Sequence, residues 1–364
     1  MCKKQKIGIL TYHTALNYGA ILQAYALISY LNQNFDKIEV EVIDYRSKFL
    51  DYTYSYQKIF NVDKKLFFPK SILLYKKKKI FNNFILNNIK LSQNQYNIKN
   101  INDATEIYDK VIVGSDQVWN ININGGDLTY FLSFLSKRKR YSYAASIGID
   151  TVKIFENLKI KNELLNFSAI SLREPSNLNI FDQEIRTNIC DVNIDPCLLL
   201  DRISWEKIIK NHYHGGKYVL VYMIKYSSNL LVRAKEIARK EKCKVICIGN
   251  FHGITGVKYK SNIDVSSFIS LFSNADYILA NSFHGTVFSI LFHKNFLVEM
   301  SHNDGRNLRL EDLLQLFGLR SRVLNRKAID SMYNAINWNY IDKKLDEERI
   351  KSKQYLRHVI YDNC

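Results

Sequence analysis

Residues 276–292 read DYILANSFHGTVFSILF, a pattern typical of a strand, a turn and a helix. Its apolar run Tyr277–Ala280 has the length and composition of a buried parallel strand. Ser282 is a residue type that begins helices, and apolar residues follow it at helical spacing up to Leu291. One ionisable side chain, His284, lies between the predicted strand and the predicted helix.

A strand, a tight turn and a helix N-terminus expose unpaired backbone N–H groups at the carboxyl edge of a sheet. Such an edge is a ready site for an anion. A histidine there can bind the anion and also donate a proton. We therefore assign His284, with Ser282 and Gly285 of the same turn, to a candidate site. The alternative for His284 is a helix-capping residue with a structural hydrogen bond.

The composition is sufficient for a large hydrophobic core. The chain has 364 residues, of which 47% are hydrophobic and 24% charged, and this predicts two domains. No apolar run approaches about 20 residues, so no membrane-spanning helix is expected. The N-terminus lacks the features of a secretion signal. The six cysteines show no metal-binding spacing, which favours free thiols in the cytoplasm and no metal site.

The charge is uneven. The net charge is +17, and residues 46–99 hold twelve Lys or Arg against two acids, together with eleven aromatic residues. A basic and aromatic segment suggests an anionic surface such as a membrane, a lipid-linked phosphate or a nucleic acid. A plain solvated face of lysines explains the composition equally well, and both interpretations stay open.

The beginning of the chain predicts a doubly wound domain. Residues 6–11 are expected to form a strand and residues 20–31 a helix with one apolar face. Asn17 and Gly19 lie in the loop between them, where the backbone must approach a ligand or the next strand. His13 precedes them and is kept as a further candidate. The loop has no G-x-G-x-x-G pattern, so no dinucleotide site is predicted.

Two more polar side chains follow predicted strands directly. Asp116 follows the buried strand Lys110–Val113 across a glycine turn, and its alternative role is that of a turn or N-cap residue. Arg173 follows a strand at residues 169–172, just before a proline. A guanidinium there suits a carboxylate or phosphate, and the alternative is a salt bridge to Glu174 or another acid.

The remaining pattern predicts two α/β domains. Strands are expected at 40–43, 141–144, 217–223, 244–248 and 296–299, and helices at 71–90, 154–167, 230–238, 264–272, 306–316 and within 335–364. Residues 192–200 are read as the crossing between domains. The predicted organisation is an N-terminal domain at 1–200 with a helical insertion at about 46–100, a C-terminal domain at 201–330, and a helical segment at 331–364 that packs back on the first domain.

The predicted fold class is therefore α/β, with two Rossmann-like domains that face a cleft. Such folds bind ligands at the carboxyl ends of their strands. Asp116 and Arg173 from the first domain and His284 from the second are expected to face this cleft.

Two motifs carry a family resemblance: NSFHGTVF at 281–288 and VGSDQVWN at 113–120. Supporting stretches lie at 17–25, 171–174, 195–200 and 306–310. Together they occur in the family's order over roughly residues 6–320, and the chain resembles the polysaccharide pyruvyl transferase family.

The resemblance implies a fold similar to GT-B glycosyltransferases. It also implies transfer of pyruvate from phosphoenolpyruvate onto two hydroxyls of a sugar as a cyclic ketal, in exopolysaccharide or capsule biosynthesis. The acceptor is then a sugar or a lipid-linked oligosaccharide, and no cofactor is needed. The first domain is expected to bind the acceptor and the second the donor. If the acceptor is lipid-linked, the enzyme is expected to work at the cytoplasmic face of the membrane, where the basic segment 46–99 would hold it.

The resemblance also implies residue roles. Arg173 is similar to the family arginine that binds phosphoenolpyruvate, and His284 to the histidine at the same ligand and our candidate acid. Asp116 is the candidate base or acceptor-orienting residue. Many members have an arginine where this chain has Ser282, so Arg306, Arg309 or the helix N–H groups are expected to supply the missing charge.

Three other interpretations remain. The first is a GT-B glycosyltransferase that uses a nucleotide sugar. The second, a nucleic-acid-binding protein, rests on charge alone, and no helix-turn-helix, RNP-type or zinc pattern supports it, so no nucleic-acid partner is expected. The third is a non-catalytic member of the family.

Overall fold

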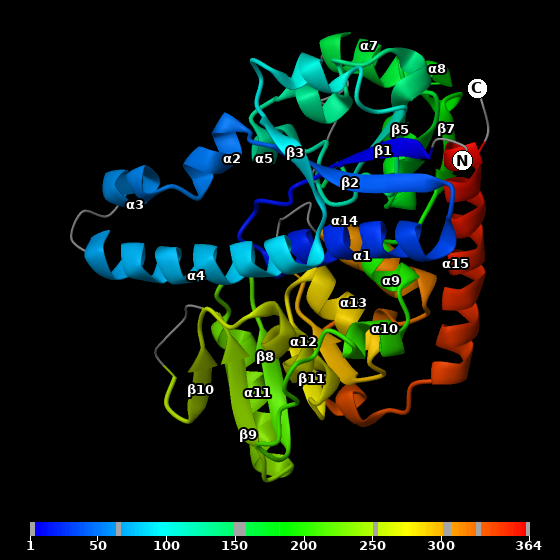
Figure 1. The fold of residues 1–364 in the computed structure, drawn as a ribbon. Helices are drawn as coiled ribbons and strands as arrows, with labels where there is room; N and C mark the ends of the chain where they lie inside the picture. The colour runs from blue at the N-terminus through cyan, green and yellow to red at the C-terminus, as the bar shows by residue number, and fades with distance from the viewer. Residues whose placement is uncertain are drawn as a thin grey trace. The chain divides into compact units, whose positions relative to one another are not determined.

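The computed structural model of the protein describes residues 4–62, 67–148, 158–181, 183–249, 254–300, 307–324 and 329–361. The chain divides into two compact units. The first unit comprises Met1–Leu199 together with Glu347–Cys364, and the second comprises Leu200–Asp346. Each unit has a parallel β-sheet with helices around it (Figure 1).

The sheet of the first unit has the strand order β3-β2-β1-β4-β5, and all neighbours are parallel. The bounds are β1 Gln5–Leu10, β2 Ile38–Tyr45, β3 Leu91–Tyr96, β4 Lys110–Val113 and β5 Arg140–Ser142. A separate parallel pair, β6 Ile170–Leu172 and β7 Ile189–Val192, joins this sheet through the bridge between Ala145 and Leu172. Because all strands are parallel, their carboxyl ends meet at one edge.

The central strands are apolar because both of their faces are covered. Ile7 and Ile9 of β1 and Ile112 of β4 have no exposed surface, as expected for the middle of a parallel sheet. The helices of this unit are α1 Tyr18–Asn34, α2 Lys48–Thr53, α3 Tyr56–Val62, α4 Phe67–Asn88, α5 Ile121–Asn124, α7 Leu158–Leu165, α8 Gln183–Arg186 and α9 Pro196–Leu199.

The predicted insertion is a helical excursion that returns to the sheet. Helices α2, α3 and α4 leave the sheet after β2, and α4 packs along α1 (Figure 1). The ring centroids of Phe81 and Tyr18 lie 5.0 Å apart, and those of Phe84 and Tyr25 lie 5.6 Å apart. The excursion ends at Asn88, earlier than the predicted residue 100, because residues 91–96 pair with β2 as the edge strand β3.

The second unit repeats the architecture with the strand order β10-β9-β8-β11-β12, again all parallel. The strands are β8 Tyr218–Tyr222, β9 Lys244–Ile248, β10 Val257–Lys260, β11 Tyr277–Ala280 and β12 Asn295–Val298. The helices are α10 Arg202–Glu206, α11 Ser228–Lys240, α12 Val265–Ser273, α13 Phe283–Leu291 and α14 Asn307–Leu316. Strand β11 is an inner strand of this sheet, paired with β8 and β12, which agrees with the burial that its apolar sequence predicts.

The last helix, α15, spans Trp338–Tyr361, and its part from Glu347 onward belongs to the first unit. Its side chains bond carbonyl groups of that unit: Lys351 Nζ donates to Val192 at 3.0 Å, and the Tyr355 hydroxyl donates to Ser142 at 2.7 Å. Among the helices in the described part of the chain, none has the length and apolar character needed to cross a membrane.

Two predicted segments differ from the structure. Residues 192–200, read as a simple crossing, include the end of β7 and the short helix α9. The helix predicted at 154–167 is observed as Leu158–Leu165, and residues 149–157 lie outside the described ranges. The elements within residues 192–200 are short, and for short elements contacts with neighbouring chain segments matter more than the local sequence pattern.

Gly114 directly follows β4, and its replacement tests how closely the backbone packs at the carboxyl edge of the first sheet. Its φ is +116°, and an added Cβ would lie 2.4 Å from the carbonyl oxygen of Tyr143. We expect Gly114→Ala to destabilise the fold by about 3 kcal/mol or more, because the clashing atom is backbone and cannot move aside. Gly126→Ala is the matched control, since its φ is +75° and nothing lies within 4 Å of the added Cβ. It should cost about 1–2 kcal/mol. Urea unfolding of both variants measures the difference, and equal losses would contradict the close contact.

Candidate active site

The turn after β4 holds Asp116 in an uncommon conformation. Its φ is +68°, a left-handed value that aspartate tolerates better than most residues. Three bonds from different elements fix the turn. Ser115 N donates to Gln23 Oε1 at 3.1 Å, Ser115 Oγ donates to the Ala144 carbonyl at 2.7 Å, and Ser146 N donates to the Asp116 carbonyl at 3.0 Å. The carboxylate of Asp116 is therefore held at the carboxyl edge of the sheet.

Gln23 supports this turn, a role that the sequence pattern did not predict. It is fully buried in α1, and its Nε2 donates to Thr11 Oγ1 and to the Ala20 carbonyl, both at 2.8 Å. Its Oε1 accepts the bond from Ser115 described above. This one side chain thus ties together the end of β1, the start of α1 and the turn that carries Asp116.

Arg173 follows β6 and is buried between two acids. Its Nε lies 2.8 Å from Glu174 Oε1, and its Nη1 lies 2.9 Å from Asp195 Oδ2. Burial acts to lower the pKa of Arg173, but the carboxylates of Glu174, Asp195 and Asp116 raise the pKa above its ordinary value. The guanidinium therefore stays charged, and Asp116 is close enough to act on it electrostatically.

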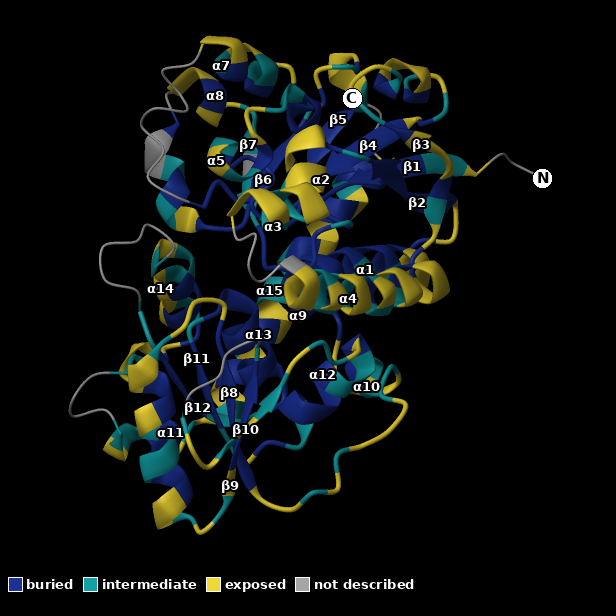
Figure 2. Ribbon diagram, turned by 90° about the vertical axis from the view of Figure 1, so that its left-hand side faces the viewer, coloured by how far each residue is buried: buried dark blue, intermediate teal, exposed yellow. Residues whose placement is uncertain are grey.

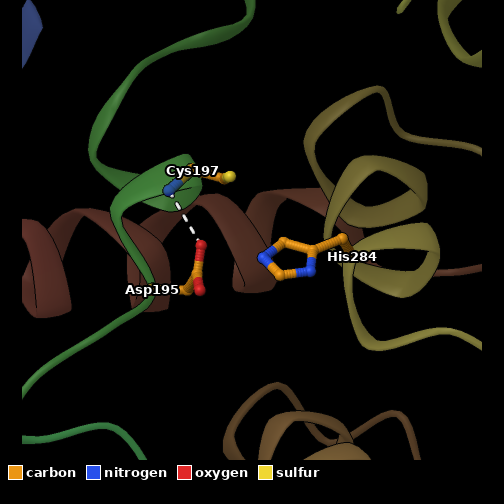
Figure 3. A group of neighbouring side chains, drawn as sticks. All are labelled: Asp195, Cys197 and His284. Atoms are coloured by element: carbon orange, nitrogen blue, oxygen red, sulfur yellow. Dashed lines mark hydrogen bonds between the residues drawn. The ribbon is translucent and has the colours of Figure 1, made fainter. Parts of the chain in front are cut away.

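Asp195 is a second residue to which the sequence assigned no role. One of its oxygens bonds Arg173, and the other accepts the N–H of Cys197 at 3.0 Å, at the start of α9 (Figure 3). The ion pair expected as the alternative for Arg173 is present with Glu174, and Asp195 adds a second partner. The first unit thus brings together Asp116 and Arg173, while the anion-binding role of Arg173 stays a prediction.

Asn17 is the N-cap of α1. Its side-chain oxygen accepts the backbone N–H of Gly19 at 2.8 Å, which satisfies one of the unpaired donors of the first turn. This bond gives Asn17 a structural reason to be at its position. The ligand contact predicted for Asn17 and Gly19 remains a prediction.

His13 forms a buried pair with Asp44. Its Nε2 lies 2.9 Å from Asp44 Oδ1 at the end of β2, and its exposed fraction is 1%. Asp44 also bonds Arg46 Nε at 2.7 Å and Gln95 Nε2 at 3.1 Å. This network links the end of β2 to the edge strand β3.

In the second unit, the predicted strand, turn and helix are β11 and α13. Ser282 is the N-cap of α13, and its hydroxyl accepts the Gly285 N–H at 3.3 Å. Its carbonyl accepts the backbone N–H and the hydroxyl of Thr286 at 3.0 and 3.1 Å. An arginine side chain has only donors and could not form this cap. Ser282 is therefore explained by helix capping, and direct contact with substrate stays a prediction.

Gly285 lies in a closely packed position. A Cβ at this position would lie 3.0 Å from both Ala280 Cβ and Tyr222 Cδ1, so a larger residue would displace its neighbours by a few tenths of an ångström. This close approach brings the first turn of α13 onto the carboxyl ends of β11 and β8.

His284 extends from the first turn of α13 (Figure 3). Its ring meets that of Phe283 edge to face, with 5.2 Å between the centroids. The guanidinium of Arg309, from α14, lies 5.8 Å from the Phe283 ring centroid. Arg309 thus lies beside the first turn of α13, and its role in supplying the charge missing at Ser282 stays a prediction. Arg306, the other candidate, lies outside the described residues.

The His13–Asp44 network predicts a pH-dependent contribution to stability. Burial acts to raise the pKa of Asp44, but hydrogen bonds from His13 and Arg46 hold it well below the usual 3.9 or so. A carboxyl with a lowered folded-state pKa stabilises the fold above its unfolded-state pKa and loses that effect as the pH falls toward the folded-state pKa. We expect Asp44→Asn to cost on the order of 2 kcal/mol at pH 7 and progressively less below about pH 4.

Urea unfolding of wild type and Asp44→Asn between pH 7 and pH 3 measures this dependence. Asp36→Asn, at an exposed position of the same unit, controls for the loss of one negative charge. A difference in unfolding free energy that stays constant over this pH range would show that Asp44 is not held by these bonds.

The fold has relatives among solved structures. UDP-GlcNAc 2-epimerase from Methanocaldococcus jannaschii is 13% identical with a TM-score of 0.54, and the match covers 97% of this chain and 99% of that one. UDP-N-acetylglucosamine 2-epimerase from Rickettsia bellii is 11% identical with a TM-score of 0.53, covering 98% and 96%. At such identities the likeness concerns the fold alone. These are GT-B-type proteins, so the predicted fold class is confirmed.

A comparison with curated proteins gave no match. The family model described as "Polysaccharide pyruvyl transferase" matches residues 17–303, which include Asp116, Arg173 and His284. Because this match spans well over half of the sequence, the chain belongs to the polysaccharide pyruvyl transferase family.

Proposed function

We propose that this protein transfers the pyruvyl group of phosphoenolpyruvate onto two hydroxyls of a sugar, as a cyclic ketal, during the synthesis of a cell-surface or capsular polysaccharide. The observation that carries the proposal is the charged, buried Arg173 at the strand edge, in a chain of this family. Phosphoenolpyruvate is a small donor with a carboxylate and a phosphate, and it requires fixed cations.

The reaction proceeds by addition to an enol ester. A proton added to C3 of phosphoenolpyruvate produces an oxocarbenium-like centre at C2. One sugar hydroxyl attacks C2, the bond from C2 to the phosphate oxygen breaks, and the second hydroxyl closes the ketal. The two hydroxyls release two protons: one balances the proton added to C3, and the other leaves with phosphate. The donor supplies its own leaving group, so the reaction needs no cofactor.

Arg173 is the proposed anchor of the donor. The planar guanidinium suits a carboxylate or a phosphate oxygen pair better than a lysine does. Glu174 and Asp195 fix its orientation through bonds of 2.8 and 2.9 Å. Oriented in advance, it would lose little conformational freedom when the donor binds.

His284 is the proposed acid at C3, because its ring stands on the first turn of α13, a helix end that favours anions. The Gly285 turn and Arg309 would hold phosphate oxygens there. Asp116 is the proposed base or acceptor-orienting group, and the start of α1 at Asn17 and Gly19 is the proposed contact for the sugar. The acceptor is a sugar or a lipid-linked oligosaccharide, and the reaction is placed in the cytoplasm.

Replacement of His284 tests the proposed acid. Acid–base catalysis contributes about 10²–10⁴-fold, so His284→Ala should lower phosphoenolpyruvate-dependent phosphate release by that factor while the folded structure persists. His212→Ala, at an exposed position of the same unit, is the matched control and should keep wild-type activity. Phosphate release near the wild-type rate in His284→Ala would remove His284 from this role.

The donor itself is tested by a direct comparison. Phosphoenolpyruvate or UDP-N-acetylglucosamine is incubated with enzyme and candidate saccharides, and products are identified by mass spectrometry. The proposal expects a ketal product with phosphoenolpyruvate only. Transfer from the nucleotide sugar alone would identify a glycosyltransferase instead.

Replacement of Arg173 tests the proposed donor anchor. Arg173→Lys should raise the KM for phosphoenolpyruvate by about tenfold or more, because lysine cannot form the bidentate contact proposed between the guanidinium and the donor.

A further inference from the structure

We propose that α3 and α4 of the first unit form a membrane-docking surface for anionic phospholipids. We define this docking surface by Phe60, Phe68, Ile72, Tyr75, Lys76 and Lys79. The proposal concerns where the protein binds and does not rest on the reaction proposed above.

The apolar members of the docking surface are exposed although they follow helical periodicity. In α4, Phe68, Ile72 and Tyr75 are 77%, 56% and 58% exposed, and Lys79 continues their spacing of four, three and four residues. Residues spaced in this way share one face of a helix. Figure 2 shows exposed residues along α3 and α4. A contiguous exposed apolar face of this kind indicates an interaction surface.

This face is not the one that α4 uses to pack on the protein. The opposite side contributes Phe81 and Ile85, which are buried, and Phe81 contacts Tyr18 of α1. Helix α4 is therefore apolar on two sides: one is buried against the protein, and the other, with Phe68, Ile72 and Tyr75, is largely exposed. The neighbouring helix α3 has no buried residue at all, although it carries Phe60, which is 47% exposed.

The charges around this face are positive. Lys76 and Lys79 are exposed, and among the described residues neither has an acidic partner. Lys77, by contrast, turns inward over the Phe81 ring, and burial lowers its pKa. Lys78 lies over the Tyr56 ring, 5.2 Å from its centroid. The lysine run thus divides into two residues that cover aromatic rings and two that face outward beside the apolar stripe.

The combination of exposed apolar side chains and lysines on this surface favours a lipid bilayer over a nucleic acid as the partner. Both partners are anionic, and both would attract the lysines. A nucleic acid contributes stacking surfaces for aromatic rings, but it has no apolar medium for aliphatic side chains such as Ile72 and Val62, which are 56% and 75% exposed. An anionic bilayer accepts aromatic, aliphatic and lysine side chains at the same depth.

Vesicle flotation of the full chain tests the proposal. Wild type should float with vesicles of phosphatidylcholine and phosphatidylglycerol, but not with phosphatidylcholine alone, and salt should weaken the binding. The double variant Lys76→Gln, Lys79→Gln should bind about thirtyfold more weakly, from the contribution of each lysine near an anionic surface. The triple variant Phe68→Ser, Ile72→Ser, Tyr75→Ser should also lose binding, but with unchanged salt dependence.

The matched control is Lys37→Gln, Lys258→Gln, which changes two exposed lysines away from the docking surface. It alters the net charge by the same amount, and it should float like wild type. If both lysine double variants bind alike, only net charge matters and the proposal is wrong. Binding to single-stranded RNA without vesicle binding would also overturn it. The assay measures no catalysis, so its result is separate from that of the phosphate-release assays.

Discussion

The buried charge of Arg173 is the constraint on which the candidate site of the first unit depends. A guanidinium inside a protein is costly unless carboxylates and hydrogen bonds compensate it. Here Glu174 bonds the next segment of the chain through Asn177 as well as bonding Arg173, at 3.1 and 2.8 Å. Asp195 bonds both Arg173 and the first turn of α9. The loops after β6 and β7 are therefore shaped around one cation, and removing any member would leave a buried charge uncompensated.

The strands that the sequence predicted to the residue are those buried on both faces. Lys110–Val113, Lys244–Ile248 and Tyr277–Ala280 are continuous apolar runs that end at glycine or polar turn residues, so pattern and environment agree. The edge strand β3 was not predicted, because its sequence LSQNQY has little apolar periodicity and exposes its three central residues. Its conformation depends on pairing with β2, a contact between residues distant in the sequence.

The positions of candidate site residues could be predicted where they follow a predictable strand. Asp116 and Arg173 were chosen as candidates because parallel strands direct their carboxyl ends to one edge. Gln23 and Asp195 were not, because their importance lies in contacts across 92 and 22 residues of sequence. On the helical pattern Gln23 is only a polar residue on the buried face of α1. Its role becomes evident only in the structure, where its Oε1 accepts the backbone N–H of Ser115.

Composition alone could not decide between a solvated lysine face and an anionic surface at residues 46–99. The two differ in where the apolar side chains point. A solvated face would direct lysines to water and the apolar residues inward. In α4, Lys77 lies inward over Phe81, while Phe68, Ile72 and Tyr75 lie outward. Contact of this exposed apolar stripe with water is unfavourable, and its burial against an apolar partner would be favourable. A partner with an apolar interior and a negative surface accounts for both the stripe and the lysines beside it.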